Sequence, residues 1–211
     1  MASNRGLRRA YTFWAPAYDL IVAPLRGSRR RAVRLLDAQP GERLLLVGCG
    51  TGADFEFVPP GVRVAAVDLT PAMLRRAARK VGDRRIALVE MDAMALAFPD
   101  GHFDKVGLHL ILAVVPDAAR ALREAERVAK PGALITVLDK FWNRPGRPPL
   151  AVRAVNAVLS RYVTAVTRSF HEIVSRTSLE LVREEPLGWG GFYFLYLLRK
   201  AGSTLAGGKT D

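Results

Sequence analysis

A buried strand that runs directly into a glycine-rich loop is the feature that most limits how this chain can fold. The apolar run 44–47 is followed at once by Gly48, Gly50 and Gly52 in a Gly-x-Gly-x-Gly pattern. Glycines here permit a tight turn and let backbone N–H groups approach a ligand closely. The next apolar run ends in Asp68, 16 residues after Gly52. Because a carboxylate at that place can accept hydrogen bonds from a ribose diol, the spacing predicts a nucleotide site.

The middle of the chain alternates strand-like runs with helical patterns. The strand-like runs are 43–47, 62–67, 85–89, 103–108 and 133–138, and the helical patterns are 71–81 and 117–129. Thr70 and Asp117 are candidate caps for the two helices. Strands that alternate with helices predict a parallel sheet of β-α-β units and therefore the α/β class.

The end of the chain has a different pattern. The strand-like runs 180–185 and 192–199 are joined by the loop 186–191, which leaves no room for a helix. Such a pair is a hairpin, so an antiparallel pair of strands should close the sheet. We expect one domain over residues 1–201 and a flexible, Gly-rich tail at 202–211.

Composition excludes several classes of protein. Half of the 211 residues are hydrophobic, so most of the chain should be ordered. One Cys excludes an intrachain disulfide framework, and three scattered His disfavour a metal site. No apolar run approaches ~20 residues, and the basic N-terminus lacks the apolar stretch of a secretory signal. These features predict a cytoplasmic protein without a metal.

The chain carries a net charge of +12, with 26 Arg against 6 Lys. Arginine binds phosphate bidentately, so the charge makes an anionic membrane surface or a nucleic acid a candidate partner. Arginines cluster at residues 5–9, 26–34 and 144–168. An Arg-rich composition without a functional role is the alternative explanation, and the sequence leaves both open.

The glycine loop and several later segments resemble one enzyme family. The sequence Val-Gly-Cys-Gly-Thr-Gly at 47–52 resembles motif I of the class I S-adenosylmethionine-dependent methyltransferases. Segments 103–106 and 128–133 resemble the fourth-strand motif and the Leu-Lys-Pro-Gly-Gly turn of that family. The resemblance implies a Rossmann-like fold with a seven-stranded, mostly parallel sheet, an antiparallel C-terminal hairpin and helices on both faces. It also implies S-adenosyl-L-methionine as cofactor and S-adenosyl-L-homocysteine as product.

The resemblance further implies which residues bind the cofactor. Asp68 corresponds to the ribose-binding acid of the family, and Asp92 to the acid near the adenine amine. The full expected set is Tyr18, Gly48, Cys49, Gly50, Thr51, Gly52, Asp68, Leu69, Met73, Asp92, Ala93, Met94 and His109. Cys49 is expected to be a small apolar filler rather than a redox group. The sequence departs from the family after the loop, because only 53–58 precedes two prolines; this helix should span about one turn and a half.

The N-terminal segment 11–20 resembles the start of the quinone methyltransferases and the bacterial phospholipid N-methyltransferases. In those families this segment folds over the cofactor as a lid, so residues 1–40 are expected to form a lid or amphipathic segment. Leu7, Tyr11, Trp14 and Tyr18 share helical spacing and form one stripe. The stripe could pack on the core or lie at a membrane interface.

Two further segments bear on the methyl acceptor. Segment 108–117 is apolar, which suits a hydrophobic acceptor. Its Val-Val-Pro-Asp ending resembles the phospholipid N-methyltransferases. Residues 141–170 form an expected acceptor-side insertion with an amphipathic pattern; it could line the acceptor cavity or merely cover the sheet edge. His109 ends the fourth strand, where ligands bind in open α/β sheets, and could contact the acceptor or the cofactor.

The resemblance thus predicts a methyltransferase for a lipid or small hydrophobic acceptor, with the amine of phosphatidylethanolamine favoured. Methyl transfer needs a lone pair aligned with the S–CH3 axis and water excluded. An amine must first lose its proton, and Tyr11, Tyr18 and His109 are the expected catalytic residues. A quinone precursor is the alternative. RNA methylation and an inactive cofactor-binding protein rank lower, so a nucleic-acid partner is disfavoured. The expected location is cytoplasmic, at the inner face of the membrane if the arginines bind lipid.

Overall fold

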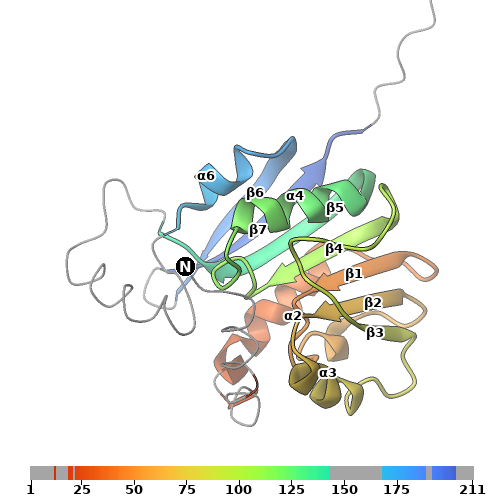
Figure 1. Ribbon diagram of the computed structural model, residues 1–211. Helices are drawn as coiled ribbons and strands as arrows, with labels where there is room; N and C mark the ends of the chain where they lie inside the picture. The colour runs from red at the N-terminus through yellow and green to blue at the C-terminus, as the bar shows by residue number, and fades with distance from the viewer. Residues whose placement is uncertain (1–11, 13–18, 21, 143–167, 189–191, 203–211) are drawn as a thin grey trace, which may run out of the picture.

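One seven-stranded sheet organises the molecule (Figure 1). The computed structural model describes residues 12, 19–20, 22–142, 168–188 and 192–202. The strand order is β3-β2-β1-β4-β5-β7-β6, with β1 to β5 parallel and β7 antiparallel to both of its neighbours. The strands are β1 Arg43–Val47, β2 Arg63–Asp68, β3 Ile86–Glu90, β4 Phe103–His109, β5 Ala129–Lys140, β6 Leu179–Leu187 and β7 Tyr193–Lys200. The predicted α/β fold with a C-terminal antiparallel hairpin is confirmed.

Helices cover both faces of this sheet, as expected (Figure 1). The helical elements are η1 Ala23–Leu25, α2 Arg26–Leu35, η2 Phe55–Phe57, α3 Pro71–Ala78, α4 Ala118–Val128 and α6 Phe170–Val174. Successive side chains of a strand point to opposite faces, so each strand supplies two cores. Leu45 and Val47 pack in a cluster with α4 and α6, whereas Leu44 and Leu46 pack in a cluster with α2, η2 and α3.

The segment after the glycine loop differs from its prediction. Instead of an α-helix of one turn and a half, it contains only the three-residue 3-10 turn η2. Only Val58 separates this turn from Pro59 and Pro60, which prevent a longer helix. The ring of Phe55 lies where a β-carbon on Gly52 would be, at 2.6 Å from that position, so the turn packs tightly under the loop.

Three other local predictions have mixed outcomes. Asp117 caps α4, because its Oδ1 accepts the Arg120 N–H at 2.9 Å. The predicted side-chain cap at Thr70 is wrong: its side chain makes no cap hydrogen bond to α3. β5 begins earlier than predicted, since Ala129 already pairs with Phe103 before a register shift.

The described part of the expected 1–40 lid contains a helix that belongs to the core. Ala32 and Val33 of α2 are buried, and Ala32 packs with Leu138 and Leu195 of the sheet. Residues 26–35 therefore cover the sheet instead of forming a lid. The aromatic stripe at residues 7–18, residues 143–167 of the insertion and residues 203–211 of the tail lie outside the described residues.

Candidate functional site

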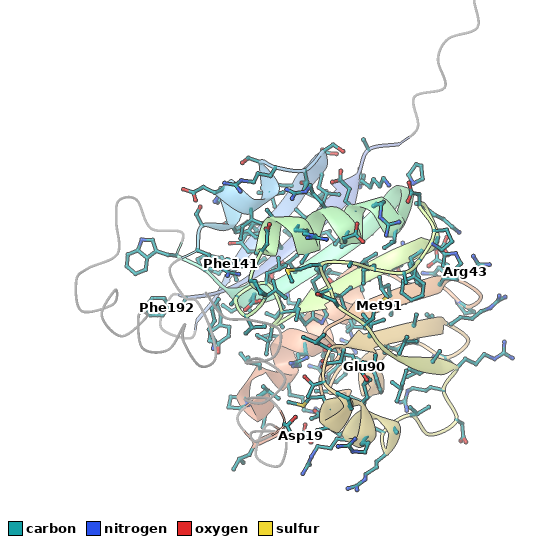
Figure 2. All side chains as sticks on the ribbon, viewed as in Figure 1. Asp19, Arg43, Glu90, Met91, Phe141 and Phe192 are labelled. Atoms are coloured by element: carbon teal, nitrogen blue, oxygen red, sulfur yellow. The ribbon has the colours of Figure 1, made fainter. Side chains whose placement is uncertain are left out.

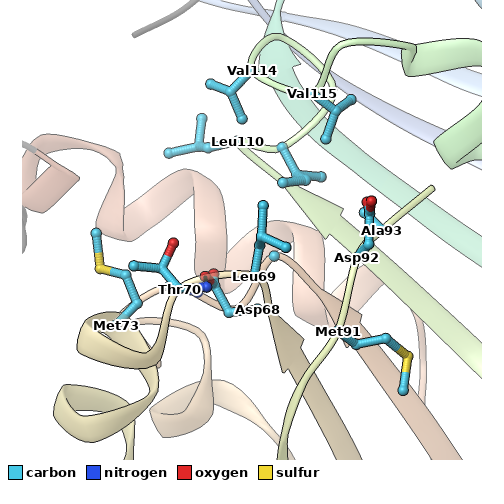
Figure 3. Close-up of a pocket in the computed structure, with 13 residues that line it drawn as sticks. Asp68, Leu69, Thr70, Met73, Met91, Asp92, Ala93, Leu110, Val114 and Val115 are labelled. Carbon is cyan, nitrogen blue, oxygen red and sulfur yellow. Dashed lines mark hydrogen bonds between the residues drawn. The ribbon is translucent and has the colours of Figure 1, made fainter. Parts of the chain in front are cut away.

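A pocket opens at the carboxyl ends of the parallel strands (Figure 3). β1 lies between β2 and β4, so the chain leaves β1 toward one edge of the sheet and later returns to build the other half from β4. Ligands in open α/β sheets bind at this change of direction. The residues that line the pocket are Gly48, Gly50, Asp68, Leu69, Thr70, Met73, Met91, Asp92, Ala93, Leu110, Ile111, Val114 and Val115.

The glycine loop presents main chain to this pocket. Gly48 adopts φ +67°, which an L side chain rarely accepts. A β-carbon there would lie 2.7–2.9 Å from the side chain of Ile111. The loop is anchored to the sheet by the Cys49 N–H, which donates to the Val67 carbonyl at 2.9 Å. Only glycine therefore allows the loop to pass this close to the segment after β4.

Asp68 ends β2 and links two parts of the pocket. Its Oδ2 accepts the Gly50 N–H at 2.9 Å, and its Oδ1 accepts the Thr70 N–H at 2.8 Å. Burial raises the pKa of the Asp68 carboxyl, and these two main-chain hydrogen bonds only partly oppose the increase. The result is a fixed acceptor at the pocket wall, between the glycine loop and the start of α3.

The segment after β3 forms a second wall. Met91, Asp92 and Ala93 line the pocket on the side opposite α3 (Figure 3). Asp92 Oδ1 accepts the Met94 N–H at 2.9 Å, and Arg120 of α4 donates to the Met94 carbonyl at 2.8 Å. These contacts hold the turn in shape, so the Asp92 carboxylate has a defined place at the pocket.

The third wall is apolar and follows β4. Leu110, Ile111, Val114 and Val115 face the pocket, and Leu110 has the unusual φ of +61° for a residue with a side chain. Two charged side chains hold this wall from behind. Asp139 Oδ2 accepts the Ala113 N–H at 2.9 Å, and burial raises the pKa of the Asp139 carboxyl. Arg168 donates to the carbonyls of Leu112 and Pro116.

Seven of the expected cofactor-binding residues line the pocket: Gly48, Gly50, Asp68, Leu69, Met73, Asp92 and Ala93. Six lining residues were not in the expected set: Thr70, Met91, Leu110, Ile111, Val114 and Val115. The sequence carried a signal for the last four, since they belong to the apolar stretch 108–117 that was linked to the acceptor. Thr70 immediately precedes the predicted helix 71–81, and Met91 follows the predicted strand 85–89 by two residues, so both lie in connections where ligands bind in this fold.

Other expected residues lie beside the pocket without lining it: Cys49, Thr51, Gly52, Met94 and His109. Cys49 packs in the cluster with α2, and burial raises the pKa of its thiol well above 9.0, which fits an apolar filler. The buried Thr51 hydroxyl donates to Asp19, which also accepts from Lys80 Nζ at 2.9 Å beside α3 (Figure 2). Tyr11 and Tyr18 lie outside the described residues.

His109 is placed differently from the expectation. Its ring is 3% exposed, and both ring nitrogens face buried side chains rather than the pocket. Nε2 lies 3.0 Å from the Thr136 hydroxyl, and Nδ1 lies 3.1 Å from Asp54 Oδ2. His109 therefore does not line the pocket, because β4 turns its last side chain into the core.

Metal-binding clusters and membrane-spanning helices can be judged over the described residues as a whole. Within them, no group of three or more His, Cys, Asp or Glu side chains is arranged to hold a metal ion. Among the helices in this part of the chain, none combines the length and the apolar character needed to cross a membrane.

The sequence matches a described family and curated relatives. Residues 45–137 match the family described as methyltransferase domain. The phosphatidylethanolamine N-methyltransferase of Cereibacter sphaeroides is 33% identical over 202 residues, which cover 91% of this chain and 97% of that protein. The demethylmenaquinone methyltransferase of Thermus thermophilus is 39% identical over 137 residues, which cover 59% of this chain and 61% of that protein.

The fold has matching solved structures as well. The crystal structure of a SAM-dependent methyltransferase from Aquifex aeolicus superposes with a TM-score of 0.61 at 20% identity, covering 81% of this chain and 88% of that one. That likeness supports the fold, and the relative aligned over almost its whole length supports the family. The chain therefore belongs to the class I S-adenosylmethionine-dependent methyltransferases, and S-adenosyl-L-methionine is its methyl donor.

Proposed function

We propose that this enzyme methylates the ethanolamine nitrogen of phosphatidylethanolamine. The observation that carries the proposal is the alignment with the phosphatidylethanolamine N-methyltransferase, which covers 97% of that relative. The demethylmenaquinone methyltransferase has higher identity, but the alignment covers only 61% of it. The regions that flank the cofactor fold usually shape the acceptor site, so a full-length match bears more directly on the acceptor.

The pocket supports a specific arrangement of the cofactor. In the proposal, the main-chain N–H groups of the glycine loop and the Asp68 carboxylate bind the methionine and ribose portions. Asp92 accepts from the adenine amine, with Met91 and Ala93 beside the ring. Leu69 and Met73 supply apolar contacts from the β2 side, where they line the pocket. Cys49, Thr51, Gly52 and Met94 contribute through the main chain that shapes the loop and the turn.

The apolar wall supports a hydrophobic acceptor. Leu110, Ile111, Val114 and Val115 bring no polar side chain to their side of the pocket. When bound, the cofactor supplies a sulfonium-activated methyl group. The chain itself must then align the acceptor nitrogen and keep water away, which an apolar wall does without a charged partner.

The acceptor amine must be neutral to act as a nucleophile. An alkyl ammonium has a pKa of about 10 by analogy with Lys, and burial lowers that pKa because the charged form loses hydration. Tyr11 and Tyr18 are the residues that we propose to orient the nitrogen or receive its proton. The variants Tyr11→Phe and Tyr18→Phe, which remove only the hydroxyl, should lower kcat for an amine acceptor and leave the affinity for S-adenosyl-L-homocysteine within about threefold.

We further propose that arginines of α2 bring the enzyme to an anionic membrane surface. Arg30, Arg31 and Arg34 are exposed, and Arg31 is already paired with Glu185. Each basic side chain near such a surface contributes about 1 kcal/mol. Arg30→Glu should therefore weaken sedimentation with phosphatidylglycerol vesicles at low salt. Arg84→Glu makes the same charge change at an exposed site at the start of β3, the opposite end of the strands from the pocket, and should have a smaller effect.

The test of the acceptor uses the full-length protein, methyl-labelled S-adenosyl-L-methionine and vesicles of phosphatidylethanolamine with phosphatidylglycerol. Label should appear in mono- to trimethylated phosphatidylethanolamine, identified by mass spectrometry. A reduced demethylquinone in the same vesicles serves as the competing acceptor. Label in the quinone alone would replace the proposal with the quinone alternative. Tight S-adenosyl-L-homocysteine binding without label in either lipid would point to a binding protein.

A further inference from the structure

Four polar side chains form a buried cluster beneath the pocket. Asp54 Oδ2 accepts from Arg29 at 3.0 Å and lies 3.1 Å from His109 Nδ1. His109 Nε2 in turn lies 3.0 Å from the Thr136 hydroxyl. None of the four is more than 4% exposed. The cluster therefore joins α2, the segment after the glycine loop, β4 and β5 within the core.

Two members of this cluster flank segments that line the pocket. Asp54 follows the last glycine of the loop by two residues, and His109 immediately precedes Leu110, the first residue of the apolar wall. The same two segments also touch at Gly48, where the Ile111 side chain occupies the space a β-carbon would need. The 3.1 Å contact between Asp54 and His109 thus links the glycine loop to the β4 exit from below.

The cluster is a poor source of stability. Burial would raise the pKa of the Asp54 carboxyl, but the charges of Arg29 and His109 hold that pKa well below its ordinary value. Two buried charges lose hydration, and apolar side chains of similar size often stabilise a core as well or better. Within the described residues, neither Asp54 Oδ1 nor His109 Nδ1 makes a hydrogen bond, so the 3.1 Å approach of His109 Nδ1 to Asp54 Oδ2 is a close polar contact. What the polar cluster provides that apolar packing does not is the attraction of Asp54 for both Arg29 and His109, which keeps α2 and the end of β4 close to the segment after the glycine loop.

We propose that Asp54 and His109, backed by Arg29, are positioning residues that set the separation between the glycine loop and the apolar wall. The inference rests on the proposed cofactor pocket, but not on the identity of the acceptor. His109 then acts through Asp54 and does not exchange a proton with the acceptor. Loss of the contact should widen the pocket and weaken cofactor binding, with little effect on kcat once cofactor is saturating.

Two conservative variants of His109 separate positioning from proton transfer. In His109→Asn, the amide nitrogen takes the place of Nδ1 and stays within reach of Asp54 Oδ2. In His109→Gln, the amide reaches the place of Nε2 and Thr136, so Asp54 keeps Arg29 as its partner but loses the contact with residue 109. Neither variant keeps an imidazole. Calorimetry measures the affinity of each variant for S-adenosyl-L-homocysteine. We expect the affinity of His109→Asn to stay within about threefold of the parent and the affinity of His109→Gln to fall at least tenfold.

The outcomes that oppose the proposal are distinct. An equal loss of affinity in both variants, or parental affinity in both, would overturn it. A large fall of kcat in both variants at saturating S-adenosyl-L-methionine would assign His109 to proton transfer instead. Failure of phosphatidylethanolamine to accept methyl groups would leave these binding results intact. A parent protein that binds no S-adenosyl-L-homocysteine would remove the cofactor pocket and this inference together.

A second comparison separates positioning from stability. The double variant Arg29→Met/Asp54→Leu replaces the ion pair by apolar side chains and should unfold at or above the parent midpoint, yet bind S-adenosyl-L-homocysteine at least tenfold more weakly. Parental affinity in a stable double variant would overturn the proposal. Arg26→Gln/Glu56→Gln is the matched control, because it removes an exposed ion pair that also joins α2 to the segment after the glycine loop. The control should bind as the parent does.

Discussion

The Asp68 carboxylate accepts the main-chain N–H of Gly50 at 2.9 Å, so the acid that ends β2 also holds the loop that follows β1. This contact ties together the two features that the sequence linked only by spacing. It means that the ribose-binding acid of the proposal is already oriented by the protein before a ligand arrives. An acceptor fixed in this way loses little conformational freedom on binding.

Replacement of Asp68 should weaken cofactor binding through both of these roles. Asp68→Ala removes the proposed ribose acceptor and frees the Gly50 N–H, so we expect a loss of about 1–3 kcal/mol of binding free energy for S-adenosyl-L-homocysteine. Asp68→Asn keeps one oxygen acceptor and should lose less. Calorimetry measures both values, and an unchanged affinity of the Ala variant would show that the acid at this place does not contact the ligand.

A methyl group at Gly48 should damage the pocket more than backbone strain alone explains. Gly48→Ala meets both an unfavourable φ of +67° and the Ile111 side chain. Gly132→Ala meets an equally unfavourable φ of +79°, but nothing lies within 4 Å of its new β-carbon. Each should cost about 1 kcal/mol or more of folding free energy, measured by urea unfolding. Only Gly48→Ala should weaken S-adenosyl-L-homocysteine binding; equal weakening in both would locate the effect in general stability.

The sequence predicted the sheet well because its signals are local. Each signal sets the backbone at its own position. Gly48 marks the loop, the apolar runs before Asp68 form strands, and the loop 186–191 joins the two strands of the hairpin. Turn residues and apolar runs act over a few residues, so the pattern of strands and helices follows from them. Right-handed crossovers then determine the face of the sheet on which each connecting helix lies, whereas the strand order depends on contacts between distant parts of the chain.

The polar cluster under the pocket could not be predicted in the same way. Arg29, Asp54 and His109 are far apart in the chain, and only the packing of α2 on the sheet brings them together. The family resemblance implied a lid for residues 1–40, and the sequence showed a cluster of arginines at 26–34, but a single buried Arg29 has no sequence pattern of its own. The direction in which the His109 side chain points depends on the residue at which β4 ends. A sequence pattern gives the end of a strand only to within a few residues.

Acid should remove the stability that Asp104 contributes. Burial opposes its ionisation, but the Lys130 ammonium and the Arg43 N–H outweigh burial and lower the pKa of Asp104 below 3.8. A depressed folded-state pKa gives stability that is present above the unfolded pKa and is lost as pH falls through the folded value. Asp104→Asn should thus be less stable than the parent by about 1 kcal/mol at pH 5–7, with a smaller difference below pH 4.

Urea unfolding at pH 7, 5, 4 and 3 measures this difference. Lys130→Met removes the partner instead of the acid and should show the same convergence toward the parent at low pH. In the double variant Asp104→Asn/Lys130→Met, the two losses of folding free energy should not add, because each single change breaks the same ion pair. A difference that stays constant over the whole range would mean that Asp104 ionises alike in the folded and unfolded chain.

Removal of Arg168 should loosen the apolar wall of the pocket. Its guanidinium donates to the carbonyls of Leu112 and Pro116, which flank Val114 and Val115 of that wall. Arg168→Met leaves both carbonyls without a charged donor, so we expect a loss of about 1–3 kcal/mol of folding free energy. Because the wall then moves more freely, S-adenosyl-L-homocysteine should also bind several-fold more weakly.

Arg127 is the matched control for Arg168. It donates in the same way to the carbonyls of Leu96 and Phe98, at 2.6 and 2.8 Å, and neither residue lines the pocket. Arg127→Met should lose a comparable amount of folding free energy in urea, since Glu124 and Asp100 also lose their partner. Its S-adenosyl-L-homocysteine affinity should match the parent. If both variants lost affinity in proportion to their loss of stability, the contacts of Arg168 with the apolar wall would have no specific part in cofactor binding.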